Sequence, residues 1–385
     1  MNVFLLPDDL ISEIERIMNV YWWKGNDFTG KGRRWKNWKS LCIPKALGGL
    51  GFKRLKEFNI AMLGKQGWKL LTEPYTLVGR ILKAKYFPAS TFREAKSGCN
   101  PSFVWRSILA AQDVVVAGCR RRVGNGQSIS VWKDSWLLGS GSGRVCSVRP
   151  QGIANMNVAA MLNEDGKSWN IRHINSIFNE EEALLIRSIP LSLNPLEDRY
   201  RWSEDAKGQY IVCSCYRKLV GNVQPRGWVG WTAVWRFRVP PKVKVFIWQL
   251  VSGILPMAEF LKRRHIPITG SCPICSRGKE STNHLFLECQ TSKEVWKAAG
   301  YISLLQVSPF EEWLQQVFSR LDEEGISNII MLLWSIWKSR NGIVWRGESF
   351  SVTGVQRATD SLLKSWRAVH EGDNRLVRDS TRQSE

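Results

Sequence analysis

The sequence predicts a mainly α-helical fold with small β-hairpins, an α+β chain with a zinc-stabilised helical module in its second half. Apolar residues recur at helical spacing in most long segments, as at Leu10, Ile14 and Ile17. Two short segments instead alternate around turn-prone residues, which is typical of hairpins. Three cysteines and one histidine between residues 272 and 289 have the spacing of metal ligands.

Helices are expected through most of the first half. Asp8 and Asp9 follow Pro7 and predict a helix start, because acidic side chains stabilise the positive end of the helix dipole. The apolar stripe after them predicts a helix that ends near Tyr21. Prolines then separate the next helical patterns, because proline disrupts a helix interior. These further helices are predicted over residues 55–72, 77–87 and 102–116.

Two hairpins are predicted between neighbouring segments. In the first, over residues 122–132, Asn125 and Gly126 permit the positive φ angles of a tight turn, and Ile129 and Val131 then alternate. In the second, residues 199–202 are expected to pair with residues 209–212 across the turn-prone residues 205–208.

The second half is predicted to be helical again. A helix is expected to open at Pro241, with Val243, Phe246 and Leu250 on one apolar face and Lys242 away from it. Further helices are predicted over residues 309–322, 327–340 and 355–370, and the polar tail from residue 371 is expected to be disordered.

Five segments are expected along the 385 residues. They are a helical connector that ends in a hairpin (1–140), an α+β linker region (141–226), a zinc-binding domain (227–300), C-terminal helices (301–370) and a polar tail (371–385). The length favours two or three folding units, since a domain usually has about 100–200 residues.

The chain is strongly basic, with 55 lysines and arginines against 34 acidic residues and a formal net charge of +21. Such an excess favours a polyanionic partner, RNA or DNA. The alternative is a solvated basic surface without a dedicated ligand. One basic stretch is interleaved with tryptophan, and two others lie near the predicted zinc-binding region. The candidate nucleic-acid contacts are Lys31, Arg33, Arg34, Trp35, Lys36, Trp38, Lys39, Lys242, Lys244, Lys262, Arg263 and Arg264.

Neither a membrane segment nor a secretory signal is predicted. The longest apolar run, residues 329–337, is about half of the roughly 20 residues that a bilayer span needs. Nothing before Pro7 is long enough to be the apolar core of a signal peptide. The expected location is intracellular, nuclear or cytoplasmic, in a reducing compartment and without a membrane partner.

No catalytic centre is predicted either. The sequence contains no phosphate-binding loop, nucleophile elbow or dinucleotide fingerprint. Asp8 and Asp9 stand at a helix start and are not interpreted as a polymerase metal pair. Cys213 and Cys215 have no partner ligands nearby in sequence and are interpreted as core or edge cysteines on a strand.

The candidate metal ligands have the spacing Cys272-x2-Cys275-x8-His284-x4-Cys289. Two thiolates separated by two residues reach one ion when the backbone turns back on itself. His284 and Cys289 lie about 140° apart on an ideal helix, so a break between them is required. Four protein ligands leave no open position, which predicts one structural zinc ion. The alternative is a reduced thiol cluster beside a buried histidine.

A resemblance to a known family rests on residues 231–296. The pattern contains Trp231-x3-Trp235, Val239-Pro-Pro-Lys-Val-Lys-Val-Phe246-Ile-Trp248, Cys272-Pro-Ile-Cys275, Glu280-x3-His284, Cys289 and Val295-Trp296. It resembles the reverse-transcriptase zinc-binding domain of plant LINE-type, non-LTR retrotransposons. Flanking motifs of the family are also similar, namely Gly48-Gly-Leu-Gly51, Val123-Gly-Asn-Gly-x-Ser and Ile336-Trp337-Lys-Ser-Arg340-Asn341.

In that family the segment lies between a polymerase domain and a ribonuclease H domain, and such proteins are often named ribonuclease H proteins. Because neither catalytic motif is found here, the resemblance implies a non-catalytic, zinc-stabilised nucleic-acid-binding connector, expected to be a truncated copy. It also implies a reverse transcriptase or ribonuclease H domain as a partner in trans. Two alternatives remain open: a protein-interaction scaffold between polymerase and nuclease domains, and a decayed mobile-element product without a present role.

Overall fold

The computed structural model describes residues 1–24, 34–139, 141–151, 155–192, 196–224, 228–305 and 309–382, with side chains described as far as residue 369. The chain forms two compact units. Unit 1 comprises Met1–Gly32 and Lys53–Asn222, and unit 2 comprises Arg33–Phe52 and Val223–Glu385. A short early segment therefore belongs to the unit that the second half of the chain builds. The finer division into five segments stays a prediction.

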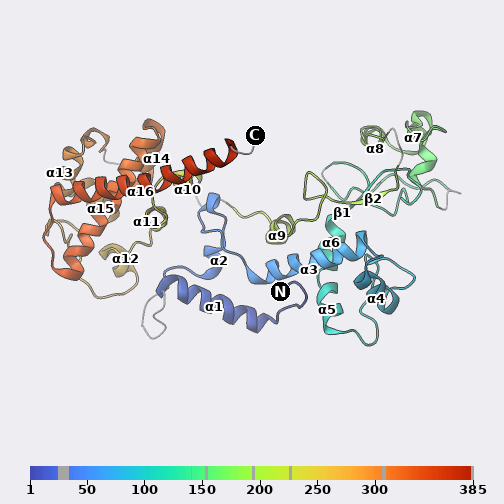
Figure 1. The fold of residues 1–385 in the computed structure, drawn as a ribbon, viewed down its shortest axis with the longest axis horizontal. Coiled ribbons are helices and arrows are strands. Elements are labelled where there is room, and N and C mark those ends of the chain that lie inside the picture. Colours follow the sequence, from blue (N-terminus) through green and yellow to red (C-terminus); the bar gives the residue numbers. More distant parts are fainter. Residues whose placement is uncertain are drawn as a thin grey trace. The chain divides into compact units, whose positions relative to one another are not determined.

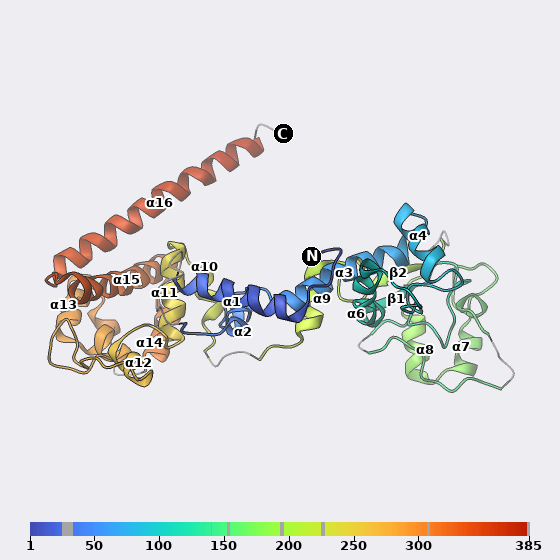
Figure 2. The same cartoon turned by 90° about the horizontal axis from the view of Figure 1, so that it is seen from below.

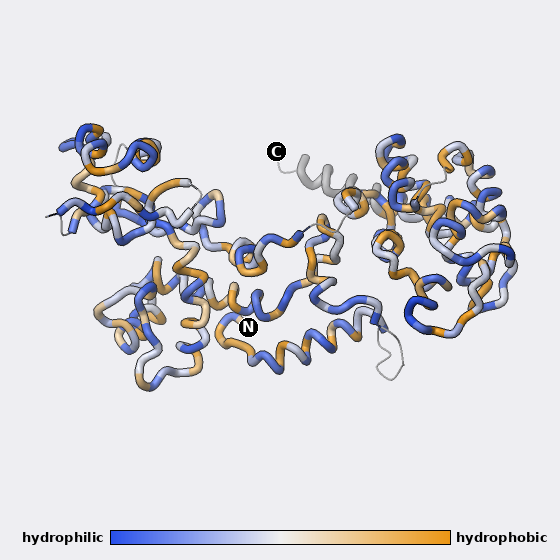
Figure 3. Tube along the Cα trace, turned by 180° about the vertical axis from the view of Figure 1, so that it is seen from behind, coloured by the Kyte–Doolittle hydropathy of each residue, from blue (hydrophilic) through white to orange (hydrophobic). Residues whose placement is uncertain are grey.

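Unit 1 is mainly helical, as predicted (Figure 1). Its long helix α3 packs against α9, α5, α6 and α1. Hydrophobic and hydrophilic residues alternate along α1 (Figure 3), which fits a helix with one packed face. The helices of unit 1 are α1 (Asp8–Lys24), α3 (Leu55–Thr72), α4 (Leu77–Tyr86), α5 (Phe103–Leu109), α6 (Gln112–Gly118), α7 (Ile171–Ile177), α8 (Glu180–Arg187) and α9 (Val212–Val220), with a 3-10 turn at Val158–Met161.

One predicted helix is divided. The helical pattern over residues 102–116 forms α5, which Ser102 caps, and then α6 after a turn at Ala110 and Ala111. The Gln112 side chain opens α6 and donates hydrogen bonds to two distant carbonyls, those of Phe92 at 2.6 Å and Ala95 at 2.8 Å. Sequence periodicity does not encode such a contact.

The fold class is confirmed, but both local hairpins are wrong. The described residues contain one two-stranded antiparallel sheet, in which β1 (Cys119–Arg122) pairs with β2 (Arg199–Trp202). The turn at Asn125 and Gly126 does not fold back on β1. Instead, the Asp198 carboxylate accepts hydrogen bonds from the amides of Gly124, Gly126 and Ser128 at 2.7–2.9 Å. A distant residue thus organises this loop and places β2 beside β1.

The second hairpin fails because its return strand does not form. Tyr210 is buried, and its hydroxyl donates to the Ala61 carbonyl at 2.8 Å. Helix α9 then begins at Val212, so Cys213 and Cys215 lie on a helix and not on a strand. Cys213 is exposed and Cys215 is buried, which agrees with their interpretation as structural cysteines.

Most tryptophans of unit 1 belong to its two hydrophobic cores. Trp68, Trp105 and Trp202 lie in the core around α3, and Trp136 lies in the core that contains α7 and α8. The Trp202 Nε1 atom donates to Ser214 Oγ at 2.9 Å, which satisfies its polar group inside the core. The high tryptophan content is therefore largely a packing feature.

The regular elements that the structure describes in unit 2 are helices, joined by loops (Figure 2). Helix α15 packs against α16 and α11, and α16 also contacts α13. The Asp322 side chain caps α15 at its start, and Gly347 ends it with a left-handed φ of 65°. The helices of unit 2 are α2 (Trp38–Leu41), α10 (Trp231–Arg236), α11 (Pro241–Val251), α12 (Ala258–Arg263), α13 (Gln290–Ala298), α14 (Phe310–Arg320), α15 (Glu323–Arg346) and α16 (Val352–Arg382).

Helix α16 is longer than predicted. It continues to Arg382, past residue 371, where the sequence predicts a disordered tail. No helix in the described ranges is both long enough and apolar enough to cross a membrane.

The segment 33–52 joins unit 2 at Gly48. This glycine has a φ of +91°, and an added Cβ would lie 2.9 Å from the Trp231 ring. On the same turn, Trp248 Nε1 donates to the Gly48 carbonyl at 3.1 Å. A side chain at this position would be strained and would separate the backbone from both indoles, which explains the glycine.

Candidate metal centre

Four side chains of unit 2 converge on one point. The ligand atoms of Cys272, Cys275, His284 and Cys289 all lie within 4.8 Å of one another. Cys272 and Cys289 are fully buried, whereas Cys275 and His284 are half-buried. The Cys275 Sγ atom lies 3.3 Å from His284 Nε2, close to the roughly 3.6 Å that Zn–S and Zn–N bonds of about 2.3 and 2.05 Å give in a tetrahedron.

The first two ligands lie on a tight turn. The Ser276 amide donates to the Cys272 carbonyl at 2.8 Å, and the Cys272 amide donates to the Gly278 carbonyl at 2.7 Å. Ser276 has a φ of 58°, a left-handed conformation that non-glycine residues rarely adopt. The turn brings Cys275 back towards Cys272, as the two-residue spacing predicts.

The second two ligands are joined by a π-helical turn. His284–Glu288 is π-helical, and the Cys289 amide donates to the His284 carbonyl at 2.7 Å. This wider turn reduces the angle between residues five apart below its α-helical value. Cys289 then lies between the π turn and α13, so the predicted break between helices is present.

Side chains cap this break on one side only. The Ser281 hydroxyl accepts a hydrogen bond from the His284 amide at 3.1 Å. Helix α13 begins at Gln290 and has no side-chain cap hydrogen bond. Cys289 occupies the N-cap position, but its thiol belongs to the metal centre and makes no capping hydrogen bond.

The thiols of Cys272 and Cys289 are electrostatically unequal. A hydrogen bond from Cys272, assisted by bonds from Ser292, lowers the pKa of Cys289 although burial opposes this shift. The same pair contact and burial raise the pKa of Cys272. These hydrogen bonds favour the thiolate form of Cys289, and the thiolate is the form that binds zinc. The donor set fits one zinc ion.

Two further residues, Gly278 and Glu280, support the ligands, and neither was predicted as a site residue. Gly278 lies against the His284 imidazole, and an added Cβ would lie 2.2 Å from its Cε1 atom. Glu280, between the two ligand pairs, accepts hydrogen bonds from Arg340 and from the Ala258 amide. The sequence signal for Glu280 and Arg340 was their place in the family motifs.

The basic tryptophan stretch is only partly available for contact. Lys31 and Arg33 lie outside the described residues. Arg34 and Lys39 are exposed, whereas Trp35 and Lys36 are half-buried.

Trp38 is buried and stacks on Phe52 with ring centroids 5.0 Å apart. A ring packed in this way cannot stack on a base, so Trp38 is corrected to a core residue.

The structure brings this stretch to α12. The Trp35 ring packs on Phe260 at 5.2 Å, and Arg264 Nη2 donates to the Trp35 carbonyl at 3.2 Å. The basic residues Lys262, Arg263 and Arg264 that end α12 and follow it are exposed. Two basic stretches far apart in sequence therefore form one surface.

The two lysines of α11 differ. Lys242 is exposed, but Lys244 is half-buried and donates to the Trp235 carbonyl at 2.9 Å. Burial, with a smaller contribution from the charge of Lys45, lowers the pKa of Lys244. The described residues contain no second cluster of possible metal ligands like that at Cys272.

Comparisons with known proteins agree with this centre. Residues 210–296 match the family described as zinc-binding in reverse transcriptase. No solved structure matches the chain.

Two relatives come from Arabidopsis thaliana. One, named "Putative ribonuclease H protein", is 27% identical over 393 residues, which cover 97% of this chain and 62% of that protein. The chain thus spans less than two thirds of this relative. The other, an uncharacterized mitochondrial protein, is 36% identical over 139 residues, which cover 36% of this chain and 90% of that protein. The chain therefore belongs to the family that carries the reverse-transcriptase zinc-binding region of plant retroelement polyproteins.

Proposed function

We propose that this chain is a non-catalytic, zinc-stabilised connector of a non-LTR retrotransposon reverse transcriptase that binds RNA or DNA. The observation that carries the proposal is the link between the metal centre and the basic surface. Helix α12 begins where the Ala258 amide donates to Glu280, between the two ligand pairs, and it ends at the basic residues beside Trp35. A zinc ion bound by the four ligands would hold the loop over residues 272–289 in place. Through α12, it would also hold the basic surface in place.

The chemistry of the centre supports a structural role. Three cysteines and one histidine are a ligand set of closed zinc sites, in which no coordination position is left for water or substrate. Bound zinc would supply a cross-link between the tight turn at Cys272 and the π-helical turn at His284. The residues of this chain would supply the contacts to phosphate.

The test is binding of the full chain to labelled single-stranded and duplex oligonucleotides across a salt series. Log affinity is expected to fall with log salt by about 0.7–0.9 for each phosphate contact. Gln substitutions at Lys39, Lys262 and Arg263 should reduce the magnitude of this slope by the amount expected for the loss of two to three phosphate contacts. Salt-independent binding, or none at low salt, would contradict the proposal.

A matched control variant distinguishes the contribution of the basic surface from that of the net charge. Gln substitutions at Lys297, Arg320 and Lys338 remove the same charge from exposed positions of unit 2 outside the basic surface. This control should keep nearly the full slope. Equal losses in the two variants would show that only net charge attracts the nucleic acid.

The connector is also proposed to act beside a reverse transcriptase or ribonuclease H domain in trans. The name of the longer Arabidopsis relative, of which this chain spans 62%, supports this partner. Recovery of such a domain with the tagged chain from nuclease-treated lysate would support the interaction. Recovery that depends on intact nucleic acid would instead assign the contact to a shared strand.

A further inference from the structure

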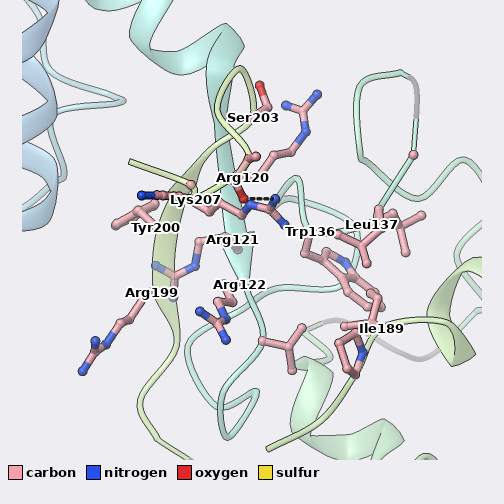
Figure 4. Close-up of a pocket in the computed structure, with 17 residues that line it drawn as sticks. Arg120, Arg121, Arg122, Trp136, Leu137, Ile189, Arg199, Tyr200, Ser203 and Lys207 are labelled. Atoms are coloured by element: carbon pink, nitrogen blue, oxygen red, sulfur yellow. Dashed lines mark hydrogen bonds between the residues drawn. The ribbon is translucent and has the colours of Figure 1, made fainter. Parts of the chain in front are cut away.

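Unit 1 contains a cavity of about 500 Å³ beside its two-stranded sheet (Figure 4). Six basic residues line it: Arg120, Arg121, Arg122, Arg199, Arg201 and Lys207. No acidic residue is among the described residues of its lining. A cavity of this volume is large enough for a nucleotide-sized ligand.

The strand register concentrates the charge on one face. Arg120 lies directly opposite Arg201, and Arg122 lies directly opposite Arg199. Residues opposite each other in a sheet share a face, and alternate residues of one strand do the same. All four arginines therefore project from the same side of the ribbon. Like charges directly opposite each other destabilise a sheet. Arg120 and Arg201 donate hydrogen bonds to the Gly141 and Ala206 carbonyls at 2.6 and 3.3 Å, which accounts for their positions, but the described residues show no such bond for the Arg122 or Arg199 side chain.

The nearby carboxylates form their ion pairs and hydrogen bonds with other groups. Asp134 pairs with Arg93 at 2.6 Å, and Glu204 pairs with Lys218 at 2.7 Å. The Asp198 carboxylate accepts hydrogen bonds from the amides of Gly124 and Gly126. Across the described ranges, no ion pair within 4.0 Å includes any basic residue of the cavity.

A buried guanidinium adds to the charge. Arg121 is only 9% exposed and stacks over the Tyr200 ring at 4.4 Å. Its Nη2 atom donates to Ser128, but its buried Nε has no hydrogen-bond partner in the described structure. Because successive residues of a strand point to opposite faces, Arg121 lies on the other face of the ribbon and adds positive charge behind the four arginines.

The other side of the cavity is apolar. Trp136, Leu137 and Ile189 lie across from the arginines in Figure 4. From this combination we propose that the cavity binds a phosphate-bearing nucleotide unit, with its phosphate on the arginines and its sugar or base against the apolar wall. The shared chemistry is a phosphate ester, whose source is either a nucleic-acid strand or a free nucleotide. The proposal goes beyond the basic surface of unit 2 and does not depend on it.

The test is arginine footprinting of the full chain with phenylglyoxal, with modified residues identified by mass spectrometry. Separate samples contain a short single-stranded oligonucleotide, a nucleoside triphosphate or inorganic pyrophosphate. Ligand should protect Arg122 and Arg199, which are exposed. Arg80 and Arg172, exposed arginines elsewhere in unit 1, should react equally with and without ligand.

A pair of variants checks the same site by affinity. Gln at both Arg122 and Arg199 should lower the salt slope of oligonucleotide binding by about 0.7 for each lost phosphate contact. Gln at both Arg80 and Arg172 should leave it unchanged. Circular dichroism should show that both variants keep the fold, since the first removes a repulsive pair.

The ligands distinguish the source. Protection by the oligonucleotide alone supports a strand, and protection by the triphosphate supports a free nucleotide. No protection of Arg122 and Arg199 by any ligand, or equal protection of Arg80 and Arg172, overturns the proposal. Because the footprint is read at each residue, failure of binding at the unit 2 surface does not change this result.

Discussion

Arg340 and Glu280 form a buried two-point ion pair that joins α15 to the loop of the metal centre. Arg340 Nε lies 2.5 Å from Glu280 Oε1, and Arg340 Nη2 lies 2.7 Å from Oε2. The two side chains are 7% and 1% exposed. Since Glu280 Oε2 also accepts the Ala258 amide at 2.8 Å, one carboxylate connects α12, α15 and the zinc loop.

The first prediction concerns this pair. Arg340→Met leaves the Glu280 carboxylate buried and unpaired, so the free energy of unfolding of unit 2 should fall by about 3–5 kcal/mol. Urea titration of the zinc-loaded chain measures this change. Lys338→Met on the same helix removes an exposed charge and should change stability by less than about 0.5 kcal/mol. Equal effects of the two substitutions would contradict the assigned role.

The second prediction concerns the metal. Elemental analysis should find one zinc per chain, and Cys272→Ser or a chelator should remove it. Without the cross-link, limited proteolysis should cut first within residues 231–299, because metal binding and folding of such a unit are coupled. Cys99→Ser, at an exposed cysteine of unit 1, should retain the zinc. A chain purified without zinc that resists proteolysis equally would refute this role.

The third prediction concerns Gly278. A methyl group there would lie 2.2 Å from His284 Cε1, so Gly278→Ala should displace the imidazole. Zinc affinity, measured by competition with a chromophoric chelator, should fall by about 10–100-fold, the usual range for residues that orient a ligand.

Gly270→Ala is the matched control for this substitution. The added methyl group would meet only the flexible end of Lys262, so zinc affinity should be nearly unchanged. Unaltered affinity in Gly278→Ala would show that the imidazole has room to move.

The metal centre was predictable because its determinants are local. The four ligands lie within residues 272–289, and their spacing encodes both the turn at Cys272 and the break before α13. The sheet was not predictable because β1 and β2 come from segments that lie far apart in sequence. The alternation at Ile129 and Val131 describes core packing, and the Asn125 turn serves the distant Asp198.

The candidate nucleic-acid contacts show the same limit. A basic run identifies charge, but it does not separate exposed residues from those that pack. Lys39 is exposed, whereas Trp38 is buried against Phe52, and only the tertiary structure distinguishes them. The arginine face of the sheet was not predictable because it exists only when Arg122 and Arg199 are paired.

The last prediction concerns the Asp198 loop in acid. Burial alone would raise the pKa of Asp198, but hydrogen bonds from the Gly124, Ser128 and Gly126 amides outweigh it and lower the pKa below its ordinary value of 3.8. A carboxyl group whose pKa is lower in the folded state stabilises the fold above its unfolded pKa. This stabilisation is lost as the pH falls through the folded pKa.

Asp198→Asn removes the charge and one acceptor oxygen, so unit 1 should lose about 1–3 kcal/mol at neutral pH. The stability difference between the unsubstituted chain and this variant should stay constant from neutral pH to about pH 5 and shrink below about pH 4. Urea titrations of both chains at each pH measure this stability difference. Because both chains contain the same metal centre, its acid sensitivity affects them equally and cancels from the difference. Glu164→Gln, at an exposed carboxylate, should show neither effect. A difference that grows as the pH falls would mean that the loop is held by something other than the Asp198 charge.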